Sequence, residues 1–187
     1  MNATIKLLAA RRSASPTLMH GPGPDAGELQ IILALAARTP DHGKLAPWRF
    51  IVFEGDGLAR AGALVAEGYA RREPQADAAR LESERGRFTR SPLVVAVVSR
   101  AAPHAKIPLW EQELSVGAVC MNLTVAATAL GFRTAWLTGW FAYDAEALRA
   151  FGLAEHEKMA GFIHIGRVDQ AVEDRARPNL AELVTRF

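Results

Sequence analysis

The segment Arg11–Ser15 (RRSAS) places two guanidinium groups and two hydroxyls within five residues. Guanidinium groups offer a planar fork of hydrogen-bond donors and serine hydroxyls add short ones, so this segment could cradle a phosphate. The segment follows an apolar stretch that we expect to be helical. A basic helix end that complements the helix dipole is a more common role for such residues, and it stays open as the alternative.

A second donor-rich segment runs from Arg38 to Phe50 (RTPDHGKLAPWRF). Here Arg38, His42 and Lys44 could reach the polar edge of a heterocyclic ligand. A single histidine is equally well explained as a turn or capping residue that bonds to backbone. A metal site is disfavoured, because His42 has only Asp41 nearby and no second histidine falls at ligand spacing.

Two further segments flank a long apolar stretch. Trp110–Glu113 (WEQE) opens it, and because the helix dipole favours acidic residues at a helix N-terminus, we prefer that explanation to a contact with a ligand ring. Gly131–Gly139 (GFRTAWLTG) follows it and ends in a Thr-Gly turn. The backbone amides of this turn could face a ligand, since glycine permits close approach. An ordinary link from a helix to a strand is the alternative.

The motifs of several common protein classes are missing from the sequence. It has no GxGxxG between a strand and a helix and no GxxxxGK[ST], so standard dinucleotide-binding and P-loop folds are disfavoured. No Ser–His–Asp or Cys–His set stands out. The single cysteine, Cys120, excludes an intrachain disulfide and a multi-cysteine metal site, and in its apolar surroundings we expect an inert thiol.

Composition and charge fit one globular domain. The 187 residues carry a formal net charge of +2, which gives no case for nucleic acid or an anionic membrane surface as a partner. No uncharged apolar stretch reaches about 18 residues, so no membrane span is expected. The short apolar run Ile5–Ala10 precedes the arginines, which reverses the order of a secretory signal. We expect a cytoplasmic protein, with a mitochondrial presequence as the minor alternative.

Hydrophobic periodicity and breaker residues predict alternating helices and strands in an irregular order. Strands are predicted over 49–54, 93–99, 133–138 and 160–166, and helices over 4–11, 57–70, 74–90, 110–130 and 144–151, with one more between Asp25 and Pro40. The region at about 71–90 is highly charged, so we expect a solvated helical arm or lid. The helix over 110–130 is apolar nearly all round, so it should be buried on all sides, one of them against a partner chain. The pattern fits a single α+β domain over residues 1–187.

Taken in order, the segments RRSAS, RTPDHGKLAPWRF, KIPLWEQELSVGA and GFRTAWLTG resemble the nitroreductase family, and especially its short members, the small NAD(P)H nitroreductases. The resemblance runs from Arg11 to Gly166, and the order and spacing of the motifs are more specific than any one of them. It implies an α/β/α sandwich with a central, mainly antiparallel sheet and a long buried helix at a homodimer interface. Larger members often have Asn-Ser before Gln-Pro-Trp, whereas this chain has the short subgroup's sequence from His42 to Trp48, which leaves the substrate open.

The resemblance also implies FMN sites built from both chains of the dimer. The first group of matching residues contacts the FMN phosphate and the pyrimidine edge: Arg11, Arg12, Ser13 and Ser15. The second reaches the flavin from the partner subunit: Arg38 and His42. The third follows the flavin ring, with a backbone amide near the reactive nitrogen: Trp136, Leu137, Thr138 and Gly139. The end of the long helix, 126–131, matches a segment assigned to the nicotinamide cofactor in relatives.

The implied activity is the oxidation of NAD(P)H coupled to the reduction of a nitroaromatic, quinone or similar small acceptor, by ping-pong hydride transfer. No catalytic side chain is required, because FMN carries the chemistry. Other flavin chemistry on the same fold stays open, namely dehalogenation, flavin destruction or a biosynthetic oxidation. A flavin-binding protein without enzymatic activity is the further alternative.

Overall fold

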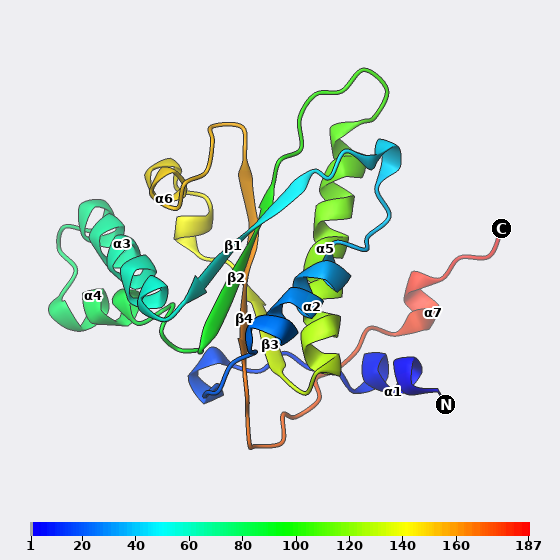
Figure 1. The fold of residues 1–187 in the computed structure, drawn as a ribbon, viewed down its shortest axis with the longest axis horizontal. Helices are drawn as coiled ribbons and strands as arrows, with labels where there is room; N and C mark the ends of the chain where they lie inside the picture. The colour runs from blue at the N-terminus through cyan, green and yellow to red at the C-terminus, as the bar shows by residue number, and fades with distance from the viewer. Residues whose placement is uncertain (1) are drawn as a thin grey trace.

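The computed structural model describes residues 2–187 and contains one four-stranded sheet in the order β1-β2-β4-β3 (Figure 1). Its strands are β1 (Trp48–Glu54), β2 (Leu93–Ser99), β3 (Arg133–Leu137) and β4 (Lys158–Gly166). All three strand pairs are antiparallel. Every residue of β2 is buried, as expected for an unbroken apolar run at the centre of a sheet covered on both faces. β3 forms one edge of the sheet, and β4 is its neighbour within the sheet.

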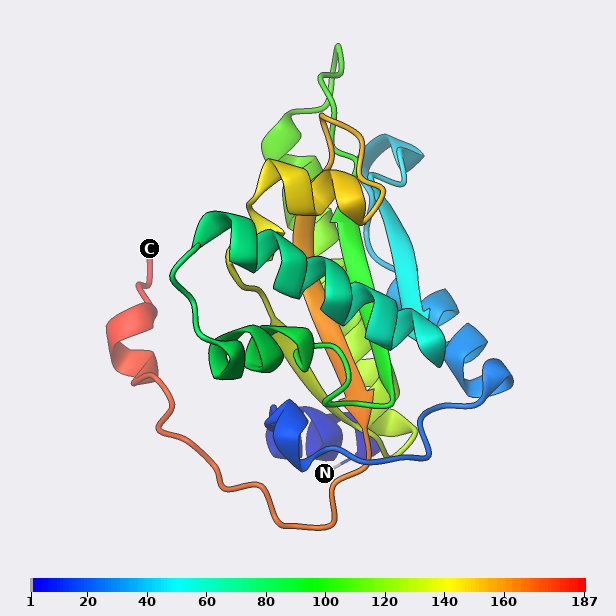
Figure 2. The same ribbon diagram turned by 90° about the vertical axis from the view of Figure 1, so that its left-hand side faces the viewer.

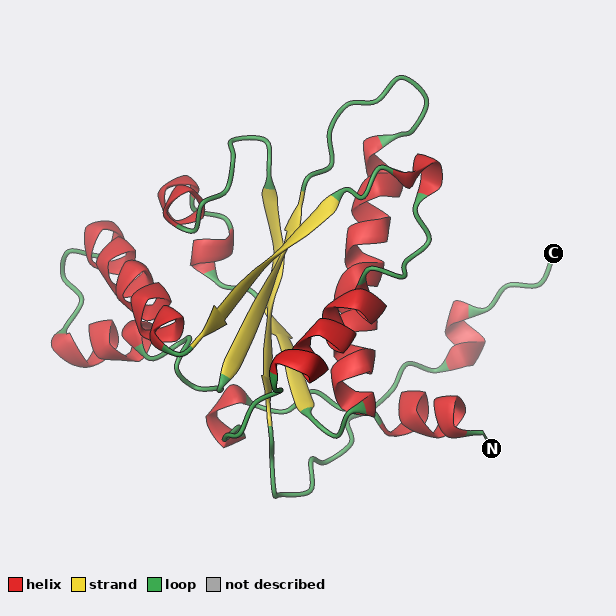
Figure 3. Cartoon of the chain, viewed as in Figure 1, coloured by secondary structure: helices red, strands yellow, loops and turns green. Residues whose placement is uncertain are grey.

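Helices cover both faces of this sheet, which confirms the α/β/α sandwich (Figures 1 and 3). On one face lie α1 (Ala3–Ala10), α2 (Ala26–Ala36) and α5 (Leu109–Ala129). On the other lie α3 (Asp56–Arg72), α4 (Ala78–Arg85) and α6 (Ala145–Ala150), as Figure 2 shows. The short turns are η1 (Pro16–Leu18), η2 (His42–Lys44) and η3 (Trp140–Ala142), and α7 (Leu180–Leu183) lies in the C-terminal tail.

Each face of the sheet has its own apolar core. On the α3 side, five phenylalanines form a cluster of edge-to-face and tilted ring pairs: Phe53, Phe88, Phe141, Phe151 and Phe162. On the α5 side the core is mainly aliphatic, and Ile32, Val119, Leu123 and Ile163 are fully buried there. The two cores fix the sheet between rigid helical layers, so the ends of β3 and α5 hold fixed positions.

Within the single chain, α5 is buried on one side only, and the cover of another side by a partner chain stays a prediction. Val119, Cys120 and Leu123 face the sheet and are fully buried. On the opposite face, Trp110 is 67% exposed and Leu114 is 53% exposed. The apolar character all round the helix therefore leaves one apolar face uncovered within the chain.

The prediction of one charged helix over 74–90 is wrong in its bounds, although most residues of this region are exposed as expected. The side chain of Asp77 caps the N-terminus of α4 and the helix ends at Gly86, so α4 has eight residues. It packs against α3 instead of extending into solvent. Glu84 is fully buried and accepts hydrogen bonds from the Arg87 guanidinium and from Trp140 Nε1. Glu84 is the buried charged residue of α4, and its carboxylate is stabilised there by ion pairs with Arg80 and Arg87.

Candidate functional site

The segment Arg11–Ser15 lies beside the edge strand β3. α1 ends at Ala10, and the chain then runs extended past the strand. Ser13 forms a parallel bridge with Thr134, and the backbone N–H of Ala14 donates to the Thr134 carbonyl at 3.1 Å. The first and the fourth of the donor-rich segments, more than 100 residues apart in the sequence, therefore meet at one edge of the sheet.

Arg12 is fixed by three acceptors. Its guanidinium donates to the carbonyls of Ala9 and Arg11, at 2.7 and 2.8 Å, and to the carboxylate of Asp174. Asp174 also accepts a hydrogen bond from Arg177 at 2.9 Å. Desolvation acts to raise the pKa of Asp174, but the hydrogen bonds from Arg12, the Arg175 backbone and Arg177 outweigh it and lower that pKa. The tail thus brings a carboxylate to the phosphate-cradle segment, and Arg177 shares that carboxylate with Arg12.

The end of β3 offers an exposed apolar surface beside this segment. Trp136 is 42% exposed and Leu137 is 40% exposed. The indole Nε1 of Trp136 donates to the Ala160 carbonyl at 3.0 Å, which holds the ring across β4. Gly161 makes this contact possible, because a Cβ there would lie 2.1 Å from Trp136 Nε1. The following residues, Thr138 and Gly139, continue as extended backbone to η3.

His42 is joined to the first turn of α5. Its Nδ1 lies 2.6 Å from Oε2 of Glu111, in a pair exposed to solvent. The loop is held close to α5 at Gly43, whose φ is +75° and whose hypothetical Cβ would lie 2.2 Å from Cδ1 of Ile107. The acidic residue that we attributed to the helix dipole therefore has a specific partner as well.

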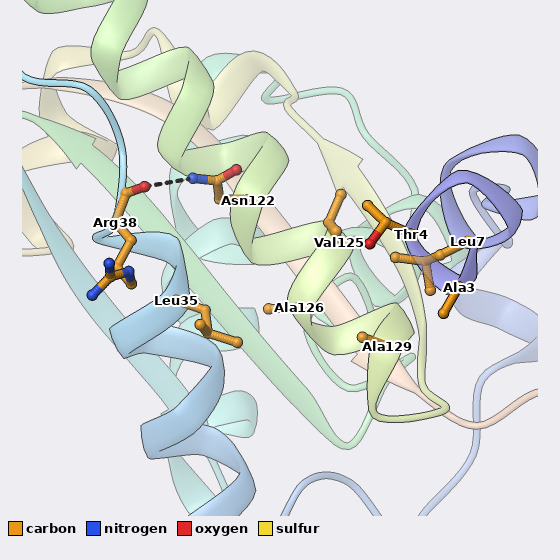
Figure 4. Close-up of a pocket in the computed structure, with 9 residues that line it drawn as sticks. All are labelled: Ala3, Thr4, Leu7, Leu35, Arg38, Asn122, Val125, Ala126 and Ala129. Carbon is orange, nitrogen blue, oxygen red and sulfur yellow. Dashed lines mark hydrogen bonds between the residues drawn. The ribbon is translucent and has the colours of Figure 1, made fainter.

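Arg38 lines a groove of about 510 Å³ between α1, α2 and α5 (Figure 4). The backbone carbonyl of Arg38 accepts a hydrogen bond from the Asn122 side chain at 3.3 Å. The groove is mostly apolar, and Figure 4 shows the side chains of α1 and of Leu35 on opposite sides of α5 residues. Its other lining residues are Ala3, Thr4, Leu7, Val125, Ala126 and Ala129.

Within one chain, His42 and the Arg11–Ser15 segment lie toward opposite ends of α5, whereas Arg38 lines the groove between α1, α2 and α5. His42 contacts Glu111 near the N-terminus of the helix, whereas α1 and the segment that follows it pack near Ala129. Glu111 and Ala129 are 18 positions apart, which corresponds to about 27 Å at the rise of an α-helix. A single chain therefore does not bring His42 to Ser13 and Trp136.

The sequence of this chain matches a known protein family and its members. The model of the nitroreductase family matches residues 8–167. The chain belongs to the nitroreductase family. Among nitroreductases, it is 36% identical over 162 residues to the Escherichia coli K12 protein named "Putative NAD(P)H nitroreductase YdjA", covering 87% of this chain and 86% of that protein.

Two solved nitroreductase structures show the same fold. A nitroreductase-like family protein from Bacillus cereus is 21% identical, with a TM-score of 0.82, and the match covers 100% of this chain and 97% of the other. A nitroreductase with bound FMN from Bacteroides fragilis is 20% identical, with a TM-score of 0.72 and full coverage of both chains. At these identities the structural likeness establishes the fold, whereas the family match over residues 8–167 confirms the resemblance drawn from the motifs.

Among residues 2–187, no three His, Cys, Asp or Glu side chains gather as a metal site. In the same part of the chain, no helix combines the length and the apolarity that a membrane crossing demands. Burial raises the pKa of the Cys120 thiol to about 12, so this cysteine is an inert packing residue.

Sequence reasoning missed three contacts of the candidate site. Asp174 and Arg177 lie in a polar tail that carried no recognisable motif, and the partner of Asp174 is 162 residues away. Glu111 was noticed, but nothing in its local sequence indicated His42, which lies 69 residues earlier. Such pairings depend on the tertiary fold and leave no local pattern.

Proposed function

We propose that this nitroreductase-family protein is an FMN-dependent NAD(P)H oxidoreductase that reduces nitroaromatics, quinones or similar small acceptors. The observation that carries the proposal is the Ser13–Thr134 bridge, because it sets a cationic, hydroxyl-rich segment beside the exposed apolar end of β3. A phosphate and a planar aromatic ring need these two surfaces next to each other. The name of the Escherichia coli relative and the FMN bound in the Bacteroides fragilis structure support the same assignment.

The donor set fits FMN. The main-chain amides and side chains from Arg11 to Ser15 provide donors for phosphate and for carbonyl oxygens. Trp136 and Leu137 provide an apolar wall that is exposed within the chain. Thr138 and Gly139 follow that wall with extended backbone, in which one amide could face the ring edge. Arg38 and His42 would complete the site from a second chain.

When bound, FMN supplies the hydride chemistry, and the protein contributes binding, orientation and electrostatics. Cationic donors from Arg11 and Arg12 would hold the phosphate, and donors at Ser15 would stabilise negative charge at the pyrimidine edge. The donor NAD(P)H and the acceptor would occupy the same open face in turn, which predicts ping-pong kinetics. The end of α5, 126–131, is the proposed contact of the nicotinamide nucleotide.

We infer a homodimer from the separation of His42 and Ser13 within one chain. In an isologous dimer with antiparallel α5 helices, the His42 end of one chain would lie beside the Ser13 end of its partner. The exposed face of α5, with Trp110 and Leu114, and the groove beside Leu35 would supply apolar interface area. The cytoplasm is the proposed compartment.

The visible spectrum of the purified protein tests the proposal. We expect oxidised-flavin absorbance that bleaches when NADH or NADPH is added anaerobically and returns with a nitroaromatic or a quinone. A flavin that binds but is reduced by neither nucleotide would favour a non-enzymatic flavin-binding protein. Reduction without turnover of any nitroaromatic or quinone would favour dehalogenation, flavin destruction or a biosynthetic oxidation. A colourless protein that takes up no added FMN would overturn the cofactor assignment.

A further inference from the structure

Trp140 opens η3 and comes directly after Thr138 and Gly139, the two residues in which a backbone amide is proposed to face the flavin ring. We call these two residues the flavin segment. The indole of Trp140 is bound to helices from an earlier part of the chain. Its Nε1 donates to Oε2 of Glu84 in α4 at 3.2 Å, and its ring lies against Tyr69 of α3, with the ring centroids 5.9 Å apart. The flavin segment is therefore joined, through the next residue, to α3 and α4.

The contacts of the indole fix it from several sides. Gly68 of α3 lies so close that a Cβ there would come within 2.9 Å of Cη2 of Trp140. The guanidinium of Arg72 lies 5.9 Å from the ring centroid, within the range of a cation–π contact. Glu84, the acceptor of the indole N–H, is fully buried and is itself held by a hydrogen bond from Arg87 at 2.8 Å. A buried network with every member bonded is rigid, so the indole has one position.

The backbone after the flavin segment is fixed as well. A Cβ at Gly139 would lie 2.7 Å from Cε1 of Phe141, so this backbone packs directly on the Phe141 ring. Phe141 is 5% exposed and belongs to the phenylalanine cluster of the α3-side core. The amides of Ala142 and Tyr143 donate to the carbonyls of Gly139 and Trp140, at 2.9 and 3.0 Å. A displacement of Trp140 would therefore move the end of the flavin segment.

We propose that Trp140 is a positioning residue, which holds the flavin segment in place through its contacts with α3 and α4. The inference rests on the proposed function, in which an amide of this segment faces the ring edge of FMN. A donor at that edge stabilises negative charge on the reduced ring only if it is held in a fixed position. Loosening Trp140 should therefore weaken FMN binding and make the midpoint potential of the bound FMN more negative.

Two glycine substitutions in α3 form a matched test. Gly68→Ala and Gly57→Ala both raise the helix propensity of α3, but only a Cβ at Gly68 meets the indole. At Gly57 the nearest atom is the end of the Arg60 side chain, at 3.8 Å. We expect Gly68→Ala to bind FMN about fivefold more weakly with a more negative midpoint potential, and Gly57→Ala to match the wild type in both. Trp140→Phe, which keeps a ring but removes the N–H, should resemble Gly68→Ala.

Hydrogen–deuterium exchange of the FMN-free protein tests the holding of the segment without flavin. Peptides that cover residues 138–144 should exchange faster in Gly68→Ala and Trp140→Phe than in the wild type and Gly57→Ala, because η3 opens more often. Thermal unfolding checks that each variant is folded.

The results separate this inference from the proposed function. Unchanged exchange in both Gly68→Ala and Trp140→Phe overturns the positioning role. Faster exchange with unchanged FMN affinity and midpoint potential also overturns it, since the segment would then not orient the flavin. A wild type that takes up no FMN overturns the proposed function, and the exchange result then decides by itself whether Trp140 holds the segment.

Discussion

Nδ1 of His42 lies 2.6 Å from Oε2 of Glu111, and this contact fixes the loop of η2 on the first turn of α5. His42 is one of the two residues proposed to reach FMN from the partner subunit. Glu111 is therefore a positioning residue in this proposal, since it determines where the imidazole lies.

Glu111→Ala should weaken FMN binding severalfold, because His42 loses the contact that orders it, while stability changes by less than about 1 kcal/mol, as for other exposed pairs. Glu111→Gln retains an acceptor and should restore most of the affinity. Quenching of flavin fluorescence measures the affinity and thermal unfolding measures stability. Equal FMN affinity in the wild type and Glu111→Ala would remove the positioning role.

Leu114→Glu should convert the proposed dimer into a folded monomer that carries little FMN. Leu114 is 53% exposed on the free face of α5, so a carboxylate there would not disturb the core of the chain but would be buried unpaired in a dimer. Leu64→Glu is the matched control, at an exposed leucine of α3 on the opposite side of the sheet. Analytical ultracentrifugation with detection at flavin wavelengths checks both properties. A yellow wild-type monomer at micromolar concentration would refute the shared site.

The elements that could be predicted best are those with a long local signal. The run LVVAVVS gave the bounds of β2 correctly, and α5 begins and ends one residue before its predicted bounds, because unbroken apolar sequence and a glycine stop at Gly131 are local. A helix was predicted in the region of α4, but its bounds and the burial of Glu84 could not be, since its charged composition is typical of a solvated helix. Trp140, which donates a hydrogen bond to the buried Glu84, lies 56 residues further along the chain, so no local pattern indicates this contact.

The same distinction between local sequence signals and tertiary contacts applies to the candidate site. The family resemblance selected Ser13 and Trp136, and the structure places the segments of both at one edge of the sheet. The contact between Arg12 and Asp174 and the hydrogen bond from Trp140 to Glu84 depend on how distant segments pack. The roles of the ten selected residues toward FMN remain predictions.

Glu84→Gln should lower the free energy of unfolding by about 3 kcal/mol, because it leaves the cations Arg80 and Arg87 around a buried neutral amide. Hydrogen bonds from Arg87 and Trp140 and the nearby cations lower the pKa of Glu84 despite the larger opposing effect of desolvation. Urea unfolding measures the loss. Glu82→Gln, at an exposed residue of the same helix, should change stability by no more than about 0.5 kcal/mol. Similar losses in both variants would show that the buried network contributes little.

Glu157 should make the stability of the protein depend on pH in the acid range. Its carboxylate accepts hydrogen bonds from Nε and Nη2 of Arg49, at 2.8 and 2.6 Å, and from the backbone N–H of Ala154 at 2.9 Å. The Arg49 hydrogen bonds outweigh desolvation and lower the pKa of Glu157 to about 2 from its ordinary 4.5. The unfolded chain therefore takes up this proton first, so the stabilisation is complete above about pH 4.5 and is lost as pH falls toward 2.

Urea unfolding at pH 7, 4 and 3 measures this contribution, which amounts to about 3 kcal/mol in full. Glu157→Gln should be less stable than the wild type at pH 7, and the difference between the two should shrink as the pH falls, because the variant has no proton to take up at this position. Glu155→Gln, at an exposed position two residues earlier, should follow the wild-type curve. A constant difference between wild type and Glu157→Gln from pH 7 to pH 3 would mean that Arg49 and Glu157 stabilise the fold by packing and not through the charge of the carboxylate.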